Sequence, residues 1–159
     1  MADDKTIKNA FISHIHKDDS RLASLKSLVE KAGYAIRDYS ITKEKPNNAN
    51  NENHIKYNIL KPQIERAGTL IVLISPKTKD SAYVNWEIEC ANRLGKRIVG
   101  VWDNGAKGCD VPDALDKYAD AVVGWRSGRV VDAIEGKVNN WEMPNGSPRP
   151  ARNITRYGC

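Results

Sequence analysis

The chain has 159 residues, enough for one domain with its own core, and its 40% hydrophobic and 28% charged residues are ordinary for a globular protein. No apolar run is long enough for a membrane-spanning helix, and the polar, acidic N-terminus is unlike a secretory signal. The three cysteines are odd in number and widely spaced, which argues against a disulfide framework and favours a reducing compartment. We therefore expect a cytoplasmic protein.

The net charge of +5 is compatible with an anionic partner, but the basic residues are scattered along most of the chain. The exception is the stretch 147–156, which has three arginines and no acid. A solvated terminus explains this stretch without a ligand. We expect one domain over residues 1–144 and a polar, basic tail over residues 145–159, and we do not expect nucleic acid or a membrane as a partner.

The first half of the chain alternates apolar and polar segments. Residues 8–13 predict a first strand, and leucines at helical spacing after it predict a helix that ends at Gly33. Residues 34–38 predict a second strand. The Asn-rich segment 42–53 has few apolar side chains to bury, so it is expected to be a loop.

The middle of the chain carries the strongest signals. Residues 55–64 have isoleucines at helical spacing and predict a helix, although Pro62 disturbs its second half. Residues 69–75 form the most apolar run and predict a central parallel strand that is buried on both faces. Residues 83–94 predict the next helix, and residues 97–102 the fourth strand.

Three weaker patterns follow, which predict a short helix within residues 111–118, a fifth strand over 119–125 and a helix over 129–141. Strands that alternate with helices predict an α/β fold. We expect a single flavodoxin-like domain with a five-stranded, mostly parallel sheet of order 2-1-3-4-5 and helices on both faces. The switch point of such a sheet lies between the first and third strands, and open α/β folds bind ligands there.

Polar residues follow the strands that converge on this edge. They are Ser13, Asp38, Ser75 and Asp103. Glu87 lies one turn into the helix after the third strand and four residues after Tyr83, so both share a helix face. An acid and an aromatic at this place can form part of a site, or they can be a surface acid beside a packed ring.

A family resemblance favours the first reading. Ser81-x-Tyr83-Val84-x-x-Glu87-Ile88 is similar to the pattern Ser-x-Trp-Cys-x-x-Glu-Leu of TIR (Toll/interleukin-receptor) domains. The strand Phe11-Ile-Ser13 with the following Lys17-Asp-Asp, and the later Gly95-Lys-Arg-Ile-Val-Gly, also resemble TIR segments. The similarity covers about residues 8–125 and is closest to the TIR-like proteins of the bacterial Thoeris anti-phage system. Tyr83 stands where the family usually has Trp, and Val84 where it often has Cys.

The resemblance implies cleavage of NAD between nicotinamide and ribose, as an NAD nucleosidase or ADP-ribosyl cyclase-like enzyme. Because nicotinamide leaves as a neutral molecule, no strong general acid is needed, and a fixed carboxylate can stabilise the oxocarbenium-like ribose. Glu87 matches the catalytic position, whereas Glu89 points away from it by helix geometry. The candidate substrate-binding residues are Ser13, His14, Asp38, Ser40, Tyr83 and Asp103.

NAD is a substrate in this interpretation, so we expect neither a cofactor nor a metal. The expected product is an ADP-ribose-derived second messenger, cyclic or conjugated, used in bacterial antiviral immunity. A separate effector protein is expected to bind it, and the chain is expected to self-assemble.

Two alternatives remain open. One is a non-catalytic TIR-like interaction module that signals by assembly, and the other is an enzyme resembling nucleoside deoxyribosyltransferases. Other classes lack their motifs. A phosphorelay receiver needs an Asp where the third strand ends in Ser75-Pro76, and there is no Walker loop, Gly-x-Gly-x-x-Gly, nucleophile elbow or His-Glu-x-x-His.

Overall fold

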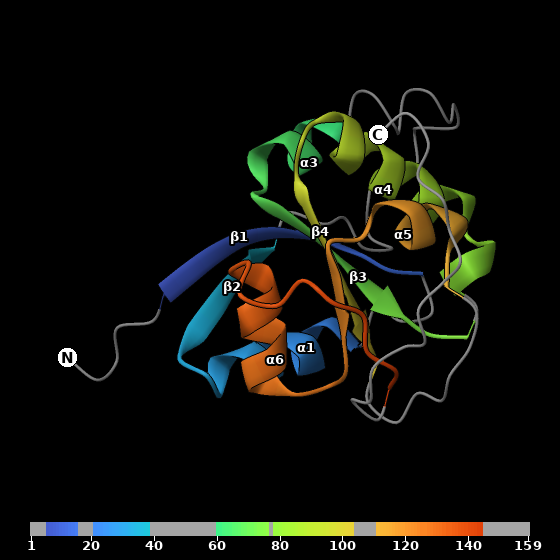
Figure 1. Ribbon diagram of the computed structural model, residues 1–159. Helices are drawn as coiled ribbons and strands as arrows, with labels where there is room; N and C mark the ends of the chain where they lie inside the picture. The colour runs from blue at the N-terminus through green and yellow to red at the C-terminus, as the bar shows by residue number, and fades with distance from the viewer. Residues whose placement is uncertain (1–5, 16–20, 39–59, 77, 104–110, 145–159) are drawn as a thin grey trace.

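The computed structural model describes residues 6–15, 21–38, 60–76, 78–103 and 111–144. Their strands form one sheet of order β2-β1-β3-β4-β5, in which every neighbouring pair is parallel (Figure 1). The strands are β1 (Thr6–Ser13), β2 (Tyr34–Asp38), β3 (Thr69–Ile74), β4 (Arg97–Trp102) and β5 (Ala121–Val123). The α/β class with a parallel sheet is therefore confirmed, and the observed strand order is the order expected from the sequence.

Helices cover both faces of the sheet (Figure 1). On one face lie α1 (Arg21–Glu30) and α6 (Ser127–Ile134). On the other lie α3 (Lys61–Arg66), α4 (Ala82–Arg93) and α5 (Asp113–Tyr118), and the short 3-10 helix η3 (Thr78–Asp80) precedes α4. Because α1 follows β1 on one face and α4 follows β3 on the other, the switch point lies between β1 and β3.

The sheet is buried where its sequence is most apolar. All six residues of β3 are buried, as expected for a central strand between two helical layers. Alternation along β1 sends Ala10 and Ile12 to the α1 side and Phe11 to the α4 side. Ser13 follows the same period of two, so its side chain lies on the face that α4 covers.

The first helix matches its pattern. The three leucines and the valine of α1 are all buried, and they are Leu22, Leu25, Leu28 and Val29. Gly33 has φ +83°, a conformation in which a Cβ would be strained, and it ends the helix as predicted.

Pro62 does not end the helix predicted over residues 55–64, of which residues 55–59 lie outside the described residues. It lies in the first turn of α3, where the missing N–H is not needed and the fixed φ suits the helix. The helix α3 continues past Pro62 to Arg66. The predicted loop 42–53 lies outside the described residues.

The prediction of a helix over residues 129–141 is wrong in its second half. The helix α6 ends at Ile134, and Gly136 takes φ +86° soon after it. The chain then returns to the edge of the sheet, where Trp141 forms a parallel bridge with Val122. The apolar residues at helical spacing thus serve two elements, because a left-handed glycine turns the chain between them.

Burial makes Cys90 a testable feature of the core. Its side chain is 4% exposed, and burial raises the pKa of its thiol. A raised pKa leaves less thiolate at pH 8, and the thiolate is the reactive form. With Cys109 and Cys159 changed to serine, we expect Cys90 to react with a disulfide reagent at least about tenfold more slowly than free cysteine.

The thiol titration should be repeated in unfolding urea, where Cys90 is expected to react at the rate of free cysteine. Fast reaction of Cys90 in the native protein would show that α4 does not pack as described.

Within the described residues, no helix is long and apolar enough to cross a membrane.

Candidate active site

The structure brings together two residues that the sequence singled out. The Ser13 hydroxyl, at the end of β1, donates a hydrogen bond of 2.6 Å to Oε1 of Glu87 on α4. Ser13 is 1% exposed and Glu87 is 8% exposed. This pair lies beside the switch point, where β1 and β3 run together and α4 covers the sheet.

Local sequence explains why α4 presents Glu87 there. Ser81 caps the helix by accepting a 3.1 Å hydrogen bond from the backbone N–H of Val84. Val84 and Ile88 are buried against the sheet, so Glu87 lies at the margin of the same buried stripe. Glu89 is exposed, as helix geometry predicted.

The aromatic residues of α4 belong partly to the core. Tyr83 and Trp86 are half-buried and pack against the cluster between α4 and the sheet. The predicted contact of Tyr83 with NAD stays a prediction.

The other candidates at this edge have different surroundings. His14 follows Ser13 and is half-buried, and its Nδ1 lies 3.0 Å from the carbonyl oxygen of Ile12, which accepts when Nδ1 carries the proton. Asp38 is the last residue of β2 and pairs with Ala10, so β2 ends three residues short of the end of β1. The Asp38 side chain and all of Ser40 lie outside the described residues.

Asp103 is held by a cation. Its two carboxylate oxygens lie 3.0 and 3.2 Å from Nε of Arg21, the first residue of α1. The Arg21 guanidinium also lies 5.5 Å from the centre of the Trp125 ring. Arg21 thus joins the end of β4 to the start of α1, a link between residues 82 positions apart. Whether Asp103 also touches NAD stays a prediction.

Removing this link should have a modest cost, because the Arg21 side chain is 33% exposed and water screens the pair. We expect Arg21→Ala to lower the free energy of unfolding by about 1 kcal/mol in urea denaturation. The matched control is Lys137→Ala, since Lys137 is 68% exposed in its pair with Glu135 and should contribute nothing measurable. Equal effects of the two substitutions would contradict a structural role for the Arg21–Asp103 pair.

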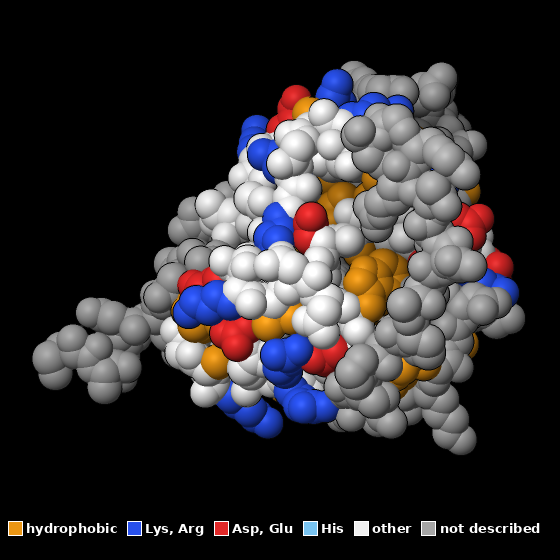
Figure 2. Space-filling model, in the orientation of Figure 1, with side chains coloured by type: hydrophobic (Ala, Val, Ile, Leu, Met, Phe, Trp, Pro, Cys, Tyr) orange, Lys and Arg blue, Asp and Glu red, His pale blue; other side chains and the backbone are white. Residues whose placement is uncertain are grey.

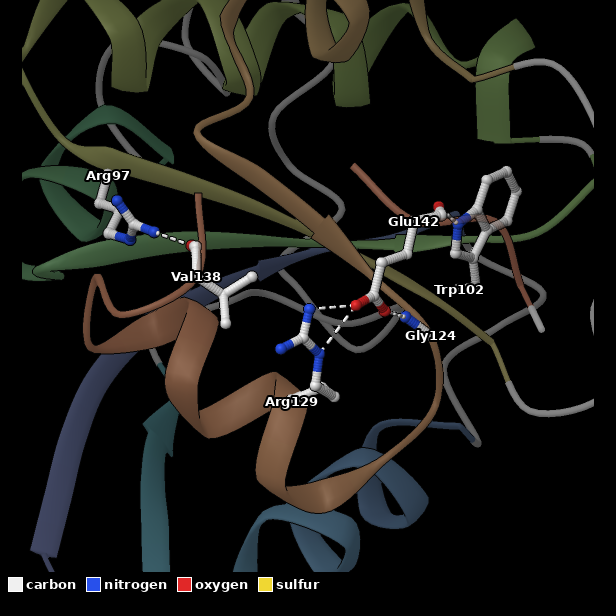
Figure 3. A network of polar contacts seen from close by, with 6 residues as sticks. All are labelled: Arg97, Trp102, Gly124, Arg129, Val138 and Glu142. Atoms are coloured by element: carbon white, nitrogen blue, oxygen red, sulfur yellow. Dashed lines mark hydrogen bonds and ion pairs between the residues drawn. The ribbon is translucent and has the colours of Figure 1, made fainter. Parts of the chain in front are cut away.

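Sequence analysis missed a second buried carboxylate. Glu142 is 4% exposed, and its Oε1 accepts a 3.2 Å hydrogen bond from the Gly124 backbone N–H (Figure 3). Its Oε2 accepts from Nε of Arg129 at 2.7 Å, and Nη2 of Arg129 forms an ion pair with the same oxygen. The Glu142 carbonyl oxygen accepts a 2.8 Å bond from the Trp102 indole.

A second set of hydrogen bonds, from Arg97, holds the chain just before Glu142. Arg97 donates to the carbonyl oxygen of Ala133 at 2.6 Å. It also donates to the carbonyl oxygen of Val138 at 2.8 Å (Figure 3). With the Glu142 contacts, these bonds hold residues 138–142 against β4 and β5. The only sequence signal was a lone acid between Trp141 and Met143, which does not reveal burial.

On the face drawn in Figure 2, Lys and Arg side chains are interspersed with Asp and Glu. A hollow of about 310 Å³ lies against one side of α1 and Trp125. None of the predicted site residues lines this hollow. Its lining includes Arg21, which forms an ion pair with the predicted site residue Asp103. Among the described residues, no three His, Cys, Asp or Glu side chains form a group that could hold a metal ion.

The parallel sheet, the helices on both faces and the buried acid beside the switch point define an α/β domain of the flavodoxin-like class. Residues 11–108 match the family described as Thoeris protein ThsB, TIR-like domain. The matched segment is more than half of the 159 residues, and the chain therefore belongs to this family.

The matched segment contains Ser13 and Glu87, so the resemblance seen in the sequence is confirmed. Among solved structures, the chain is similar to the TIR domain of the Toll-related receptor TRR-2 from Hydra magnipapillata. The two share 17% identity with a TM-score of 0.48, over 80% of this chain and 92% of that one. A comparison with curated proteins gave no significant match.

Proposed function

We propose that this TIR-like domain consumes NAD by cleaving the bond between nicotinamide and ribose, with Glu87 as the catalytic residue. The observation that carries the proposal is the buried Glu87 carboxylate, held 2.6 Å from the Ser13 hydroxyl at the strand edge where α/β folds bind ligands. Membership of the Thoeris TIR-like family supports the same activity.

The chemistry needs little more than a fixed negative charge. As the bond between ribose C1′ and the pyridinium nitrogen breaks, its electron pair leaves with neutral nicotinamide and positive charge develops on the ribose. A carboxylate that is already desolvated stabilises this charge more strongly than one in water, and it needs no reorganisation during the reaction. A nucleophile, which is water, another group of the same nucleotide or a second molecule, then adds to C1′ and releases its proton.

The remaining contacts with NAD are proposed from the edge of the sheet. The residues proposed to bind substrate are His14, Asp38, Ser40, Tyr83 and Asp103. NAD would be the substrate, so this reaction needs no resident cofactor. The product is proposed to be a cyclic or conjugated ADP-ribose-derived messenger that a separate effector binds in the cytoplasm, with self-assembly of this domain as part of activation.

The test measures NAD and its products by liquid chromatography and mass spectrometry in cells that express the chain, with and without phage challenge. We expect loss of NAD, release of nicotinamide and an ADP-ribose-derived product whose mass identifies the cyclic, linear or conjugated form. The Glu87→Gln variant serves as the inactive reference. No turnover under challenge would contradict the enzyme and favour the interaction module, and exchange of free bases between deoxynucleosides would instead favour a transferase.

A further inference from the structure

We propose that Ser13 is a positioning residue, whose hydroxyl holds the Glu87 carboxylate in place and does not donate to NAD. The inference rests on the proposed function, because it assigns Ser13 a role through the catalytic acid. It also separates two roles that residues at a strand end can have, contact with the substrate and support of the group that reacts.

The hydrogen bond itself is the first argument. Its length of 2.6 Å lies in the range of O–H donors bound to ionised carboxylates. A serine hydroxyl has a single proton. While that proton is donated to Oε1 of Glu87, Ser13 has none left for the amide or the hydroxyl groups of NAD.

Burial is the second argument. Ser13 is 1% exposed, so its hydroxyl is covered on nearly all sides, whereas the acid that it binds is 8% exposed. A residue that binds substrate directly needs an open side toward the ligand. Ser13 therefore suits support of Glu87 better than contact with a nucleotide.

The third argument is that the bond joins two rigid elements. Ser13 pairs with Val72 in the parallel ladder, and its neighbour Phe11 is fixed in the core on the same face. Glu87 lies on a helix that Val84 and Ile88 anchor to that core. A glutamate has three side-chain torsions, and a fixed hydroxyl selects the rotamer that delivers its carboxylate to the strand edge.

Loss of the Ser13 hydroxyl should therefore affect the chemical step more than substrate affinity. A displacement of about 1 Å in a reacting group can cost about a hundredfold in rate. We expect Ser13→Ala to lower kcat for NAD by about ten- to a hundredfold and to change KM by no more than about twofold. Ser13→Thr, which restores a hydroxyl, should recover a large part of kcat.

The matched control is Thr69→Val, which removes a hydroxyl from a buried residue at the opposite, amino-terminal end of β3. Its kcat should stay within about twofold of the parent chain. A rise in KM for Ser13→Ala with unchanged kcat would overturn the inference, because it would make Ser13 a substrate contact.

A second measurement does not depend on activity. The unfolding equilibria of Ser13→Ala, Glu87→Ala and the double variant form a double-mutant cycle, because each single substitution removes the hydrogen bond. If Ser13 holds Glu87, the effects are not additive, and the unfolding equilibrium constant of the double variant departs at least about threefold from the product of the single effects. Additive effects would overturn the inference.

The two measurements separate this inference from the proposed function. Absence of NAD turnover in the parent chain under phage challenge would overturn the proposed function, and the positioning role with it. Normal turnover in the parent chain with an unchanged kcat in Ser13→Ala would overturn the positioning role alone.

Discussion

Glu87→Gln is expected to lower NAD turnover at least about a hundredfold and to leave the folded protein as stable as the parent chain or more stable. The loss of activity follows because a neutral amide cannot offset positive charge on the ribose, and preorganised electrostatic groups typically contribute about 10²–10³ in rate. Stability is kept because Gln has the same shape and its amide oxygen can still accept from Ser13. The substitution also removes a charge from a site that is 8% exposed.

The measurement combines nicotinamide release with urea unfolding of the same two proteins. Glu89→Gln is the matched control, because it makes the same chemical change two residues along the helix at an exposed position. Its turnover is expected to stay within about twofold. Comparable losses in the two variants would show that net charge, and not the Glu87 carboxylate, controls the activity.

Glu142→Ala is expected to lower the free energy of unfolding by about 3 kcal/mol. Breaking a buried ion pair typically costs about 3–5 kcal/mol, and the lower end applies here because the Arg129 side chain is 34% exposed and can reach water. The substitution also leaves the Gly124 backbone N–H without its carboxylate acceptor.

Arg129→Ala provides the sharper comparison. The substitution removes the cation that pairs with the Glu142 carboxylate, which is 4% exposed. It should therefore lower the free energy of unfolding at least as much as Glu142→Ala does, although Arg129 is the more exposed partner. Urea denaturation of the two variants and of Glu135→Ala, an acid in a more exposed pair, tests this order. A loss below about 1 kcal/mol in both Glu142→Ala and Arg129→Ala would show that residues 138–142 do not depend on this contact.

The buried carboxylates of Glu87 and Glu142 have different positions in the fold, which favours different roles for them. Glu142 is bound by a cation and a backbone N–H, an arrangement that offsets its charge in the folded state. Glu87 accepts a hydrogen bond from the Ser13 hydroxyl beside the switch point. The Glu142 contacts are suited to holding structure, and a buried carboxylate at the switch point is suited to chemistry on a cationic substrate.

Local patterns in the sequence determined most of the elements. The continuous apolar run of β3 predicted burial on both faces, because only a strand between two helical layers can bury every side chain. Apolar spacing predicted the buried face of α1, and Gly33 predicted its end. The prediction failed where a residue had two local meanings, as with Gly136 inside a run of helical spacing.

The polar residues that follow each apolar run also identified the carboxyl ends of the strands, and hence the neighbourhood of Ser13 and Glu87. Which of these polar groups bind each other depends on the three-dimensional arrangement. Ser13 and Glu87 are 74 positions apart, Arg21 and Asp103 are 82 apart, and the Trp102 indole reaches the Glu142 carbonyl 40 positions away. Such partners depend on strand register, helix rotation and burial, which no short pattern contains, because the energy of a polar contact is set by distances through space and by exclusion of water.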